Sequence, residues 1–181
     1  LWLTLPVKKG KLEANISEIE LIKGRDFQKL IKTLKNFYSK TPTFDLHFVT
    51  IESIFLNSNN SLNDINFELF MYVIKVLEIN TKIIKSTDLK LQEKNANDRL
   101  LEICTKLNAT KYIAGKGGKN YMDENIFKAQ NIEILWQDFP VEDIRYEQGK
   151  GEFINGLSIL DVLFNIGTKK TKELVLTPWK N

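Results

Sequence analysis

The chain has 181 residues, of which 43% are hydrophobic and 27% are charged, and its formal net charge is +3. This is the balance of an ordinary globular protein, and the length suits one domain, which we expect to span residues 1–181. Cys104 is the only cysteine. A disulfide framework and a zinc site built on cysteines are therefore excluded, and we expect a reducing, cytoplasmic setting.

The composition also argues against two kinds of partner. The richest apolar stretch, FELFMYVIKVLEI, is interrupted by three charged residues, so it is too short and too charged to span a membrane. Arg25, Arg99 and Arg145 are the only arginines. Because duplex readout depends on clustered arginines, we expect no nucleic-acid partner, although steeply salt-dependent DNA binding would reopen that question. Weak attraction to anionic lipid headgroups remains open.

Two extended stretches, LWLTLPV and ANISEIELI, flank the segment KKGK. This pattern predicts an N-terminal β-hairpin over residues 1–22. Because the chain begins inside a predicted strand, we expect the N-terminal part of the fold to lie outside it.

Two helices are predicted next. Residues 26–38 place apolar side chains three and four positions apart, which is the pattern of one buried helix face. The segment SKTPTF ends this helix, since Pro42 disfavours a helical residue before it. In DLHFVTIESIFL the recurrence of Leu46, Val49, Ser53 and Leu56 also favours a helix.

The middle of the chain predicts an α/β fold. Ser61 and Asp64 form a capping box before an apolar helix face. Strand patterns at 81–87, 111–115 and 131–137 then alternate with helix patterns at NDRLLEICTKLNA and DENIFKAQ. This βαβαβ order over residues 81–137 predicts a mainly parallel sheet with flanking helices, as in Rossmann-like folds.

The stretch AGKGGKNYMD follows one of these strands, and ligands bind beyond the carboxyl ends of parallel strands. Its glycines allow close backbone approach, free amides accept a phosphate or carboxylate, and a lysine adds charge. The predicted ligand-binding residues here are Gly115, Lys116, Gly117, Gly118, Lys119, Asn120 and Tyr121. The glycine spacing matches neither G-x-G-x-x-G nor G-x-x-x-x-G-K-[ST], the two glycine-rich nucleotide-binding patterns. The alternative is a strand-to-helix turn with Asp123 as helix N-cap.

Other polar residues have simpler explanations. The run from Ser86 to Asp88 either lines the same cleft or ends a strand in a turn. Ser158 and Asp161 again read as a capping box, with Gly167 just past the end of the helix. His47, the only histidine, has no partner at metal-ligand spacing, so we expect it at the surface or an interface. No metal or cofactor is expected.

Several stretches together resemble the WbqC-like family. They are WLTLPV, the Y-x-K-x-P-x-F pattern from Tyr38 to Phe44, GGKNYMDENIF, the Tyr-Glu-Gln triplet at 146–148, and LSILDVLFNIG. The resemblance covers about residues 2–167, with the segments in the same order. Longer members carry a preceding segment with a His-Gln-Pro-x-Tyr-Leu-Pro-Trp motif.

The resemblance implies a bacterial protein associated with O-antigen or other surface polysaccharides, with a glycine (aminoacyl) transferase role suggested for some members. A sugar-nucleotide or sugar-linked small molecule is the expected partner, with peripheral contact to membrane enzymes. The catalytic residues and the oligomeric state stay open. Gln148 and Asn165 join the glycine-rich loop as predicted ligand-binding residues that give polar support. The alternative is a non-catalytic glycan- or nucleotide-binding module.

Overall fold

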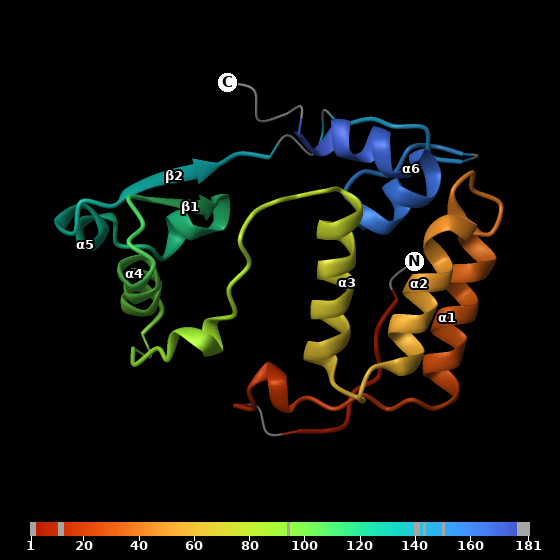
Figure 1. The fold of residues 1–181 in the computed structure, drawn as a ribbon, viewed down its shortest axis with the longest axis horizontal. Helices are drawn as coiled ribbons and strands as arrows, with labels where there is room; N and C mark the ends of the chain where they lie inside the picture. Colours follow the sequence, from red (N-terminus) through yellow and green to blue (C-terminus); the bar gives the residue numbers. More distant parts are fainter. Residues whose placement is uncertain are drawn as a thin grey trace. The chain divides into compact units, whose positions relative to one another are not determined.

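The computed structural model describes residues 3–10, 13–93, 95–139, 142, 144–149 and 151–176 (Figure 1). Helices dominate, together with one short parallel pair of strands. The elements in order are η1 (Ile16–Glu18), α1 (Arg25–Tyr38), α2 (Phe44–Asn57), α3 (Leu62–Val76), η2 (Ser86–Leu89), α4 (Ala96–Lys106), β1 (Lys111–Gly115), η3 (Lys116–Asn120), α5 (Glu124–Ala129), β2 (Glu133–Gln137) and α6 (Ile159–Leu176), where η denotes a 3₁₀ helix.

The chain divides into two compact units, and each is described by itself. Unit 1 contains residues 1–80 and 141–181, and unit 2 contains residues 81–140. The helices α1, α2, α3 and α6 belong to unit 1, and the helices α4 and α5 with both strands belong to unit 2.

The core of unit 1 is built from α1, α2, α3 and α6. The predicted apolar face of α1 is confirmed for Phe27, Leu30, Ile31 and Leu34, which are buried, but Phe37, which the same pattern included, is 67% exposed. The helix predicted after Ser61 is confirmed too, and its N-cap hydroxyl accepts a bond from the Asp64 N–H at 3.2 Å. The buried core residues are Leu21, Phe27, Leu30, Ile31, Leu34, Phe44, Phe48, Ile51, Phe55, Ile65 and Phe164.

The helix α2 forms as expected, but a different face is buried. Leu46 and Val49, which suggested the helix, are each 69% exposed. The buried face carries Phe44, His47, Phe48, Ile51 and Phe55. Both faces of this helix are apolar, so spacing alone identifies the helix and does not tell which face packs inward.

The predicted N-terminal hairpin is not shown. Among the described residues the two arms meet at a single antiparallel bridge, between Val7 and Leu21. The second arm also pairs with the segment just before α3, because the Leu21 N–H donates to the Asn60 carbonyl at 2.6 Å. Backbone groups that a hairpin ladder would use are thus shared with another segment, and residues 11–12 lie outside the described part.

The helix α6 is bent at Gly167, which has φ +73° and ψ 173° inside the helix. The prediction that Gly167 follows the end of a helix holds for the first helical run, because Gly167 itself has non-helical φ and ψ; a second run then continues to Leu176. Thr43 supports the bend: its hydroxyl donates to the carbonyls of Leu163 and Phe164 at 2.5 and 2.9 Å. A Cβ at position 167 would lie 3.0 Å from the Thr43 methyl carbon, so only glycine suits this position.

In unit 2, β1 and β2 pair in parallel, with Ile113 opposite Leu135. The predictions of both strands and of α4 and α5 are confirmed. The helices contribute Cys104 and Phe127 to a small core with Ile132. The strand predicted at 81–87 is wrong, since this segment leads instead into the 3₁₀ helix η2. A Rossmann-like sheet is therefore not confirmed: the described part of the chain has a two-stranded parallel sheet and six α-helices.

Candidate functional site

The glycine-rich loop of unit 2 follows β1 and forms the 3₁₀ helix η3. An asparagine of α4 fixes its far end: the Asn97 side-chain amide donates to the Tyr121 carbonyl at 2.9 Å. The Asn97 oxygen accepts from the Asp123 N–H at 3.0 Å. Asp123 itself caps α5 by accepting from the Asn125 N–H at 3.0 Å. The interpretation of Asp123 as a helix cap is thus confirmed.

The three glycines of this loop have different reasons for being glycine. Gly118 is buried, and a Cβ there would lie 2.9 Å from the Trp136 ring and 3.0 Å from the Met122 sulfur. Gly115 and Gly117 have open space where a Cβ would be and no left-handed φ. Packing therefore requires Gly118, whereas the fold of this unit leaves room for side chains at the other two positions.

The charged and aromatic groups of the loop face solvent. Lys116 pairs with Asp138 at 3.2 Å, and both side chains are about four-fifths exposed (79% and 80%). The Lys119 ammonium lies 5.5 Å from the centre of the Trp136 ring. Asn120 is exposed, as is Tyr121 at 60%. The loop thus presents two lysines and an accessible tyrosine ring, and Lys116 already has a weak, water-screened partner.

The remaining two predicted residues, Gln148 and Asn165, lie in unit 1, around Asp161. Asp161 is only 3% exposed. Its Oδ2 accepts from the Tyr146 hydroxyl at 2.6 Å and from the Gln148 amide at 3.0 Å. The Asn165 amide donates to the Asp161 backbone carbonyl at 2.8 Å. The capping role expected for the Asp161 side chain is therefore wrong, since this carboxylate accepts bonds from another segment.

Two tyrosines complete the surroundings of this carboxylate. Burial, followed by hydrogen bonding to Asp161, raises the pKa of Tyr38 well above its usual range. The same two causes raise the pKa of Tyr146. A phenol is protonated at neutral pH even at its ordinary pKa, and the Tyr146 hydroxyl donates to the carboxylate. We call Tyr38, Tyr146, Gln148, Asp161 and Asn165 the Asp161 cluster.

Gln148 also shapes the loop before α6. Its side-chain oxygen accepts from the Ile154 N–H at 2.7 Å, and its amide donates to the Ile154 carbonyl at 3.2 Å. One side chain thus holds the loop closed and reaches the buried carboxylate at the same time. A substitution of Gln148 would loosen both.

The Asp161 cluster opens into a cavity of about 360 Å³ in unit 1. Tyr38, Gln148, Asp161 and Asn165 line it, together with the Thr41 side chain and apolar residues that include Leu34 and Leu157. Phe37 stands at this cavity with 67% of its surface exposed. The cavity therefore combines buried polar groups with an accessible aromatic ring, which is the usual make-up of a small-molecule site.

Sequence reasoning missed the role of the two tyrosines, although a signal was present. Tyr38 begins the Y-x-K-x-P-x-F stretch, Tyr146 begins Tyr-Glu-Gln, and Asp161 lies in LSILDVLFNIG. Three of the stretches that carry the family resemblance thus meet at one buried carboxylate. Their convergence was not apparent from the spacing, because 123 positions separate Tyr38 from Asp161.

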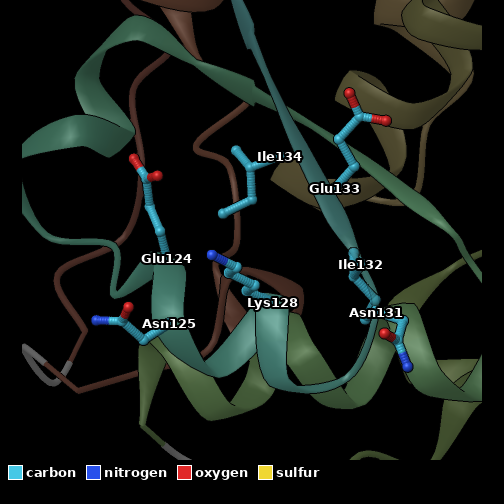
Figure 2. A pocket seen from close by; sticks show the side chains of 7 residues that line it. All are labelled: Glu124, Asn125, Lys128, Asn131, Ile132, Glu133 and Ile134. Carbon is cyan, nitrogen blue, oxygen red and sulfur yellow. The ribbon is translucent and has the colours of Figure 1, made fainter.

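A hollow of about 570 Å³ in unit 2 lies beside α5 and the start of β2 (Figure 2). Lys128 extends from the helix into it, and Glu133 points away (Figure 2), where it pairs with Lys111 at 3.3 Å. Most of the lining side chains are exposed or half-buried, and only Ile132 is buried. This hollow lacks a buried polar group and is an open, solvated surface.

The remaining polar residues considered from the sequence do not form a further site among the described residues. Ser86, Thr87 and Asp88 are exposed and form a 3₁₀ turn. His47 is 2% exposed, so the expectation of a surface position is wrong; its Nδ1 lies 2.7 Å from the Tyr72 hydroxyl. Its Nε2 is buried with no hydrogen-bond partner in the described part of the chain. No three His, Cys, Asp or Glu side chains among the described residues are grouped to hold a metal ion.

Within the described ranges, none of the helices has the length and apolarity needed to cross a membrane.

Residues 1–173 match the WbqC-like protein family. The chain is 32% identical, over 172 residues, to a Mycobacterium tuberculosis protein named uncharacterized protein Rv1507c; the match covers 93% of this chain and 73% of that protein. No solved structure matches the chain significantly. The chain belongs to the WbqC-like protein family.

Proposed function

We propose that this chain is a cytoplasmic, transferase-like protein of bacterial surface-polysaccharide (O-antigen) biosynthesis. It acts on a sugar-linked or nucleotide-linked intermediate and transfers glycine or another aminoacyl group. The observation that carries the proposal is the buried Asp161 carboxylate at the wall of a cavity of about 360 Å³. Family membership and the convergence of three resemblance stretches on this carboxylate support it.

The cavity has the chemistry that a sugar requires. Sugar hydroxyls need donors and acceptors, and the Thr41 hydroxyl and the side chains of Gln148 and Asn165 line the space. Sugar C–H faces pack against an apolar ring, and the exposed Phe37 side chain offers one. The sugar-bearing end of the substrate therefore belongs in this cavity, with Phe37 as its platform.

In an aminoacyl transfer, the amine of an aminosugar attacks an activated carboxyl carbon. A C–N bond forms, the bond to the leaving group breaks, and the amine proton ends on the leaving group or on water. The chain supplies orientation for this step: Asp161, held by Tyr146 and Gln148, accepts a hydrogen bond from the amine and aims its lone pair. The bonds from the Tyr146 hydroxyl and the Gln148 amide hold the carboxylate in place.

The glycine-rich loop is the proposed anion-accepting site of unit 2. Gly115 and Gly117 have room beside the backbone, which lets a phosphate or carboxylate approach the amides closely. Lys116 or Lys119 would neutralise the charge, and Tyr121 would stack on a sugar or base. This assignment stands independently of the Asp161 cavity.

The proposal is tested by binding of sugar nucleotides and free aminosugars, followed through thermal stability, because a ligand of the folded state raises it. Phe37→Ala should weaken sugar binding about tenfold while the fold remains. Leu46→Ala, which trims a side chain of similar exposure (69% against 67%) away from this cavity, is the matched control. Equal affinity in the parent and both variants would overturn the cavity assignment.

A second candidate is a non-catalytic glycan- or nucleotide-binding module. It is favoured by the way that donors from the chain itself already occupy Asp161. Both candidates predict sugar binding, and only the transferase predicts a new amide on the sugar. Mass spectrometry of the aminosugar after incubation with an activated glycine separates the two.

A further inference from the structure

The outer face of α1 carries a row of cations. Arg25, Lys29, Lys32 and Lys35 follow one another at spacings of three and four, so they lie on one side of the helix. All four side chains are exposed. None takes part in an ion pair within the described part of the chain.

These cations line a groove of about 620 Å³ between α1 and α2, which lie side by side (Figure 1). The opposite wall carries one carboxylate, Glu52, and the apolar side chain of Leu56. Four positive charges face one negative charge, so the groove is strongly positive. Its charge is complementary to a surface of phosphates.

An apolar stripe runs along α2 from this groove. Leu56, Val49 and Leu46 are spaced seven and three residues apart, which keeps them near one another on the helix. They are 55%, 69% and 69% exposed, although the opposite face of the same helix fills the core. Exposed aliphatic side chains beside a row of cations are the combination found on proteins that lie on a membrane surface.

We propose that this face of α1 and α2 is a docking surface for an anionic membrane. The four cations contact lipid phosphates, and Leu46, Val49 and Leu56 enter the boundary between headgroups and acyl chains. A nucleic acid would satisfy the cations but would offer no apolar phase to the stripe. An interface with another protein centres more often on aromatic side chains than on leucine and valine.

The first test is sedimentation of the 181-residue chain with vesicles of phosphatidylcholine alone or with 30% phosphatidylglycerol. We expect binding to the anionic vesicles only, weakened at least tenfold when salt rises from about 0.05 to 0.5 M, because salt screens exposed charges. Equal binding to both vesicle types, or none to the anionic ones, would overturn the proposal.

Charge removal locates the surface. Each lysine near an anionic bilayer contributes about fivefold to partitioning. The double variant Lys29→Gln/Lys32→Gln should therefore bind about 25-fold more weakly. Lys169→Gln/Lys170→Gln removes two exposed lysines of α6 and serves as the matched control, with an expected change below about twofold. An equal loss in both variants would show attraction to net charge and would reject this surface.

Apolar insertion is read from a dye at position 49. Val49→Cys accepts an environment-sensitive dye, since Cys104 is only 3% exposed. Its emission should shift to the blue with anionic vesicles, and Leu46→Ser in the same background should weaken binding several-fold. Binding to duplex DNA or polyglutamate as tight as to the vesicles, without a blue shift, would assign a polyanion or an acidic protein instead. The test is independent of sugar binding, so failure of one proposal leaves the other standing.

Discussion

The Asp161 cluster of unit 1 and the glycine-rich loop of unit 2 both contain polar side chains and tyrosine, but they differ in exposure. In the cluster the carboxylate is 3% exposed and receives bonds from Tyr146 and Gln148. In the loop the lysines and Tyr121 face solvent, and the ion pair of Lys116 is about four-fifths exposed on both sides (79% and 80%). The Asp161 carboxylate is therefore held by hydrogen bonds within the fold at the wall of a cavity, whereas the charged groups of the loop face solvent.

The largest expected effect comes from the buried carboxylate. Asp161→Ala leaves the Tyr146 hydroxyl and the Gln148 amide without this acceptor. Since each unsatisfied buried group costs about 1–3 kcal/mol, we expect the free energy of unfolding to fall by about 3–5 kcal/mol. Asp138→Asn changes an exposed carboxylate that pairs with Lys116, and should leave stability unchanged within error. Urea denaturation measures both. Similar losses in the two variants would erase the contrast between the regions.

Glycine substitutions give the next contrast. Gly167→Ala forces a side chain into φ +73° and ψ 173°, against the Thr43 methyl, and should lower the free energy of unfolding by about 2–4 kcal/mol. Gly117→Ala meets open space and should stay within about 0.5 kcal/mol of the parent. The midpoint of thermal unfolding gives the comparison. A stable Gly167→Ala would contradict the bend described for α6.

A pH titration should distinguish the units. Burial lowers the pKa of His47 below its ordinary value of 6.5. Below pH 6.5 the folded state therefore binds fewer protons than the unfolded state. The contribution of neutral His47 to the free energy of unfolding is full above pH 6.5 and is lost as pH falls below it. Unit 2 has no histidine. Its Glu102 carboxylate accepts a bond from the Glu93 N–H, which lowers the pKa of Glu102, so the contribution of this group to stability is lost only below pH 4.5.

Hydrogen exchange between pH 7 and 5 should therefore show loosening of unit 1 first. His47→Gln is the control that removes this step. Loss of protection in both units at the same pH, or an unchanged profile in His47→Gln, would reject His47 as its source.

The smallest effect on stability is expected in the glycine-rich loop itself. Lys116→Ala removes a solvent-screened ion pair, so thermal unfolding should not change measurably. Binding of pyrophosphate or a sugar nucleotide should weaken several-fold, as should binding by Lys119→Ala. Calorimetric titration measures both. Parent-like affinity in the two variants would remove the loop as an anion site.

Local patterns were sufficient for much of the fold. The apolar spacing of α1, the Ser61 cap of α3 and the strand Lys111–Gly115 were all predicted from neighbouring residues. These features depend on periodicity and on hydrogen bonds within a few residues, which a sequence displays directly. The same is true of Asp123, whose cap partner is two residues away.

The wrong predictions concern features that depend on contacts between segments far apart in the sequence. A strand at 81–87 needs a neighbouring strand, and β-branched residues alone do not provide one. Asp161 follows Ser158 at capping distance, yet its carboxylate is bonded to Tyr146, a residue of another segment. His47 offered no sequence signal of burial, because the Tyr72 hydroxyl that meets it comes from α3.

The bend in α6 has a practical consequence for distance measurements. Thr43, from the start of another helix, takes part in satisfying the carbonyls of Leu163 and Phe164, so the two halves of α6 do not share one continuous axis. Two spin labels placed on opposite sides of Gly167 should not show the separation of a straight rod, which grows by about 1.5 Å per residue. Labels within one half should follow that rule.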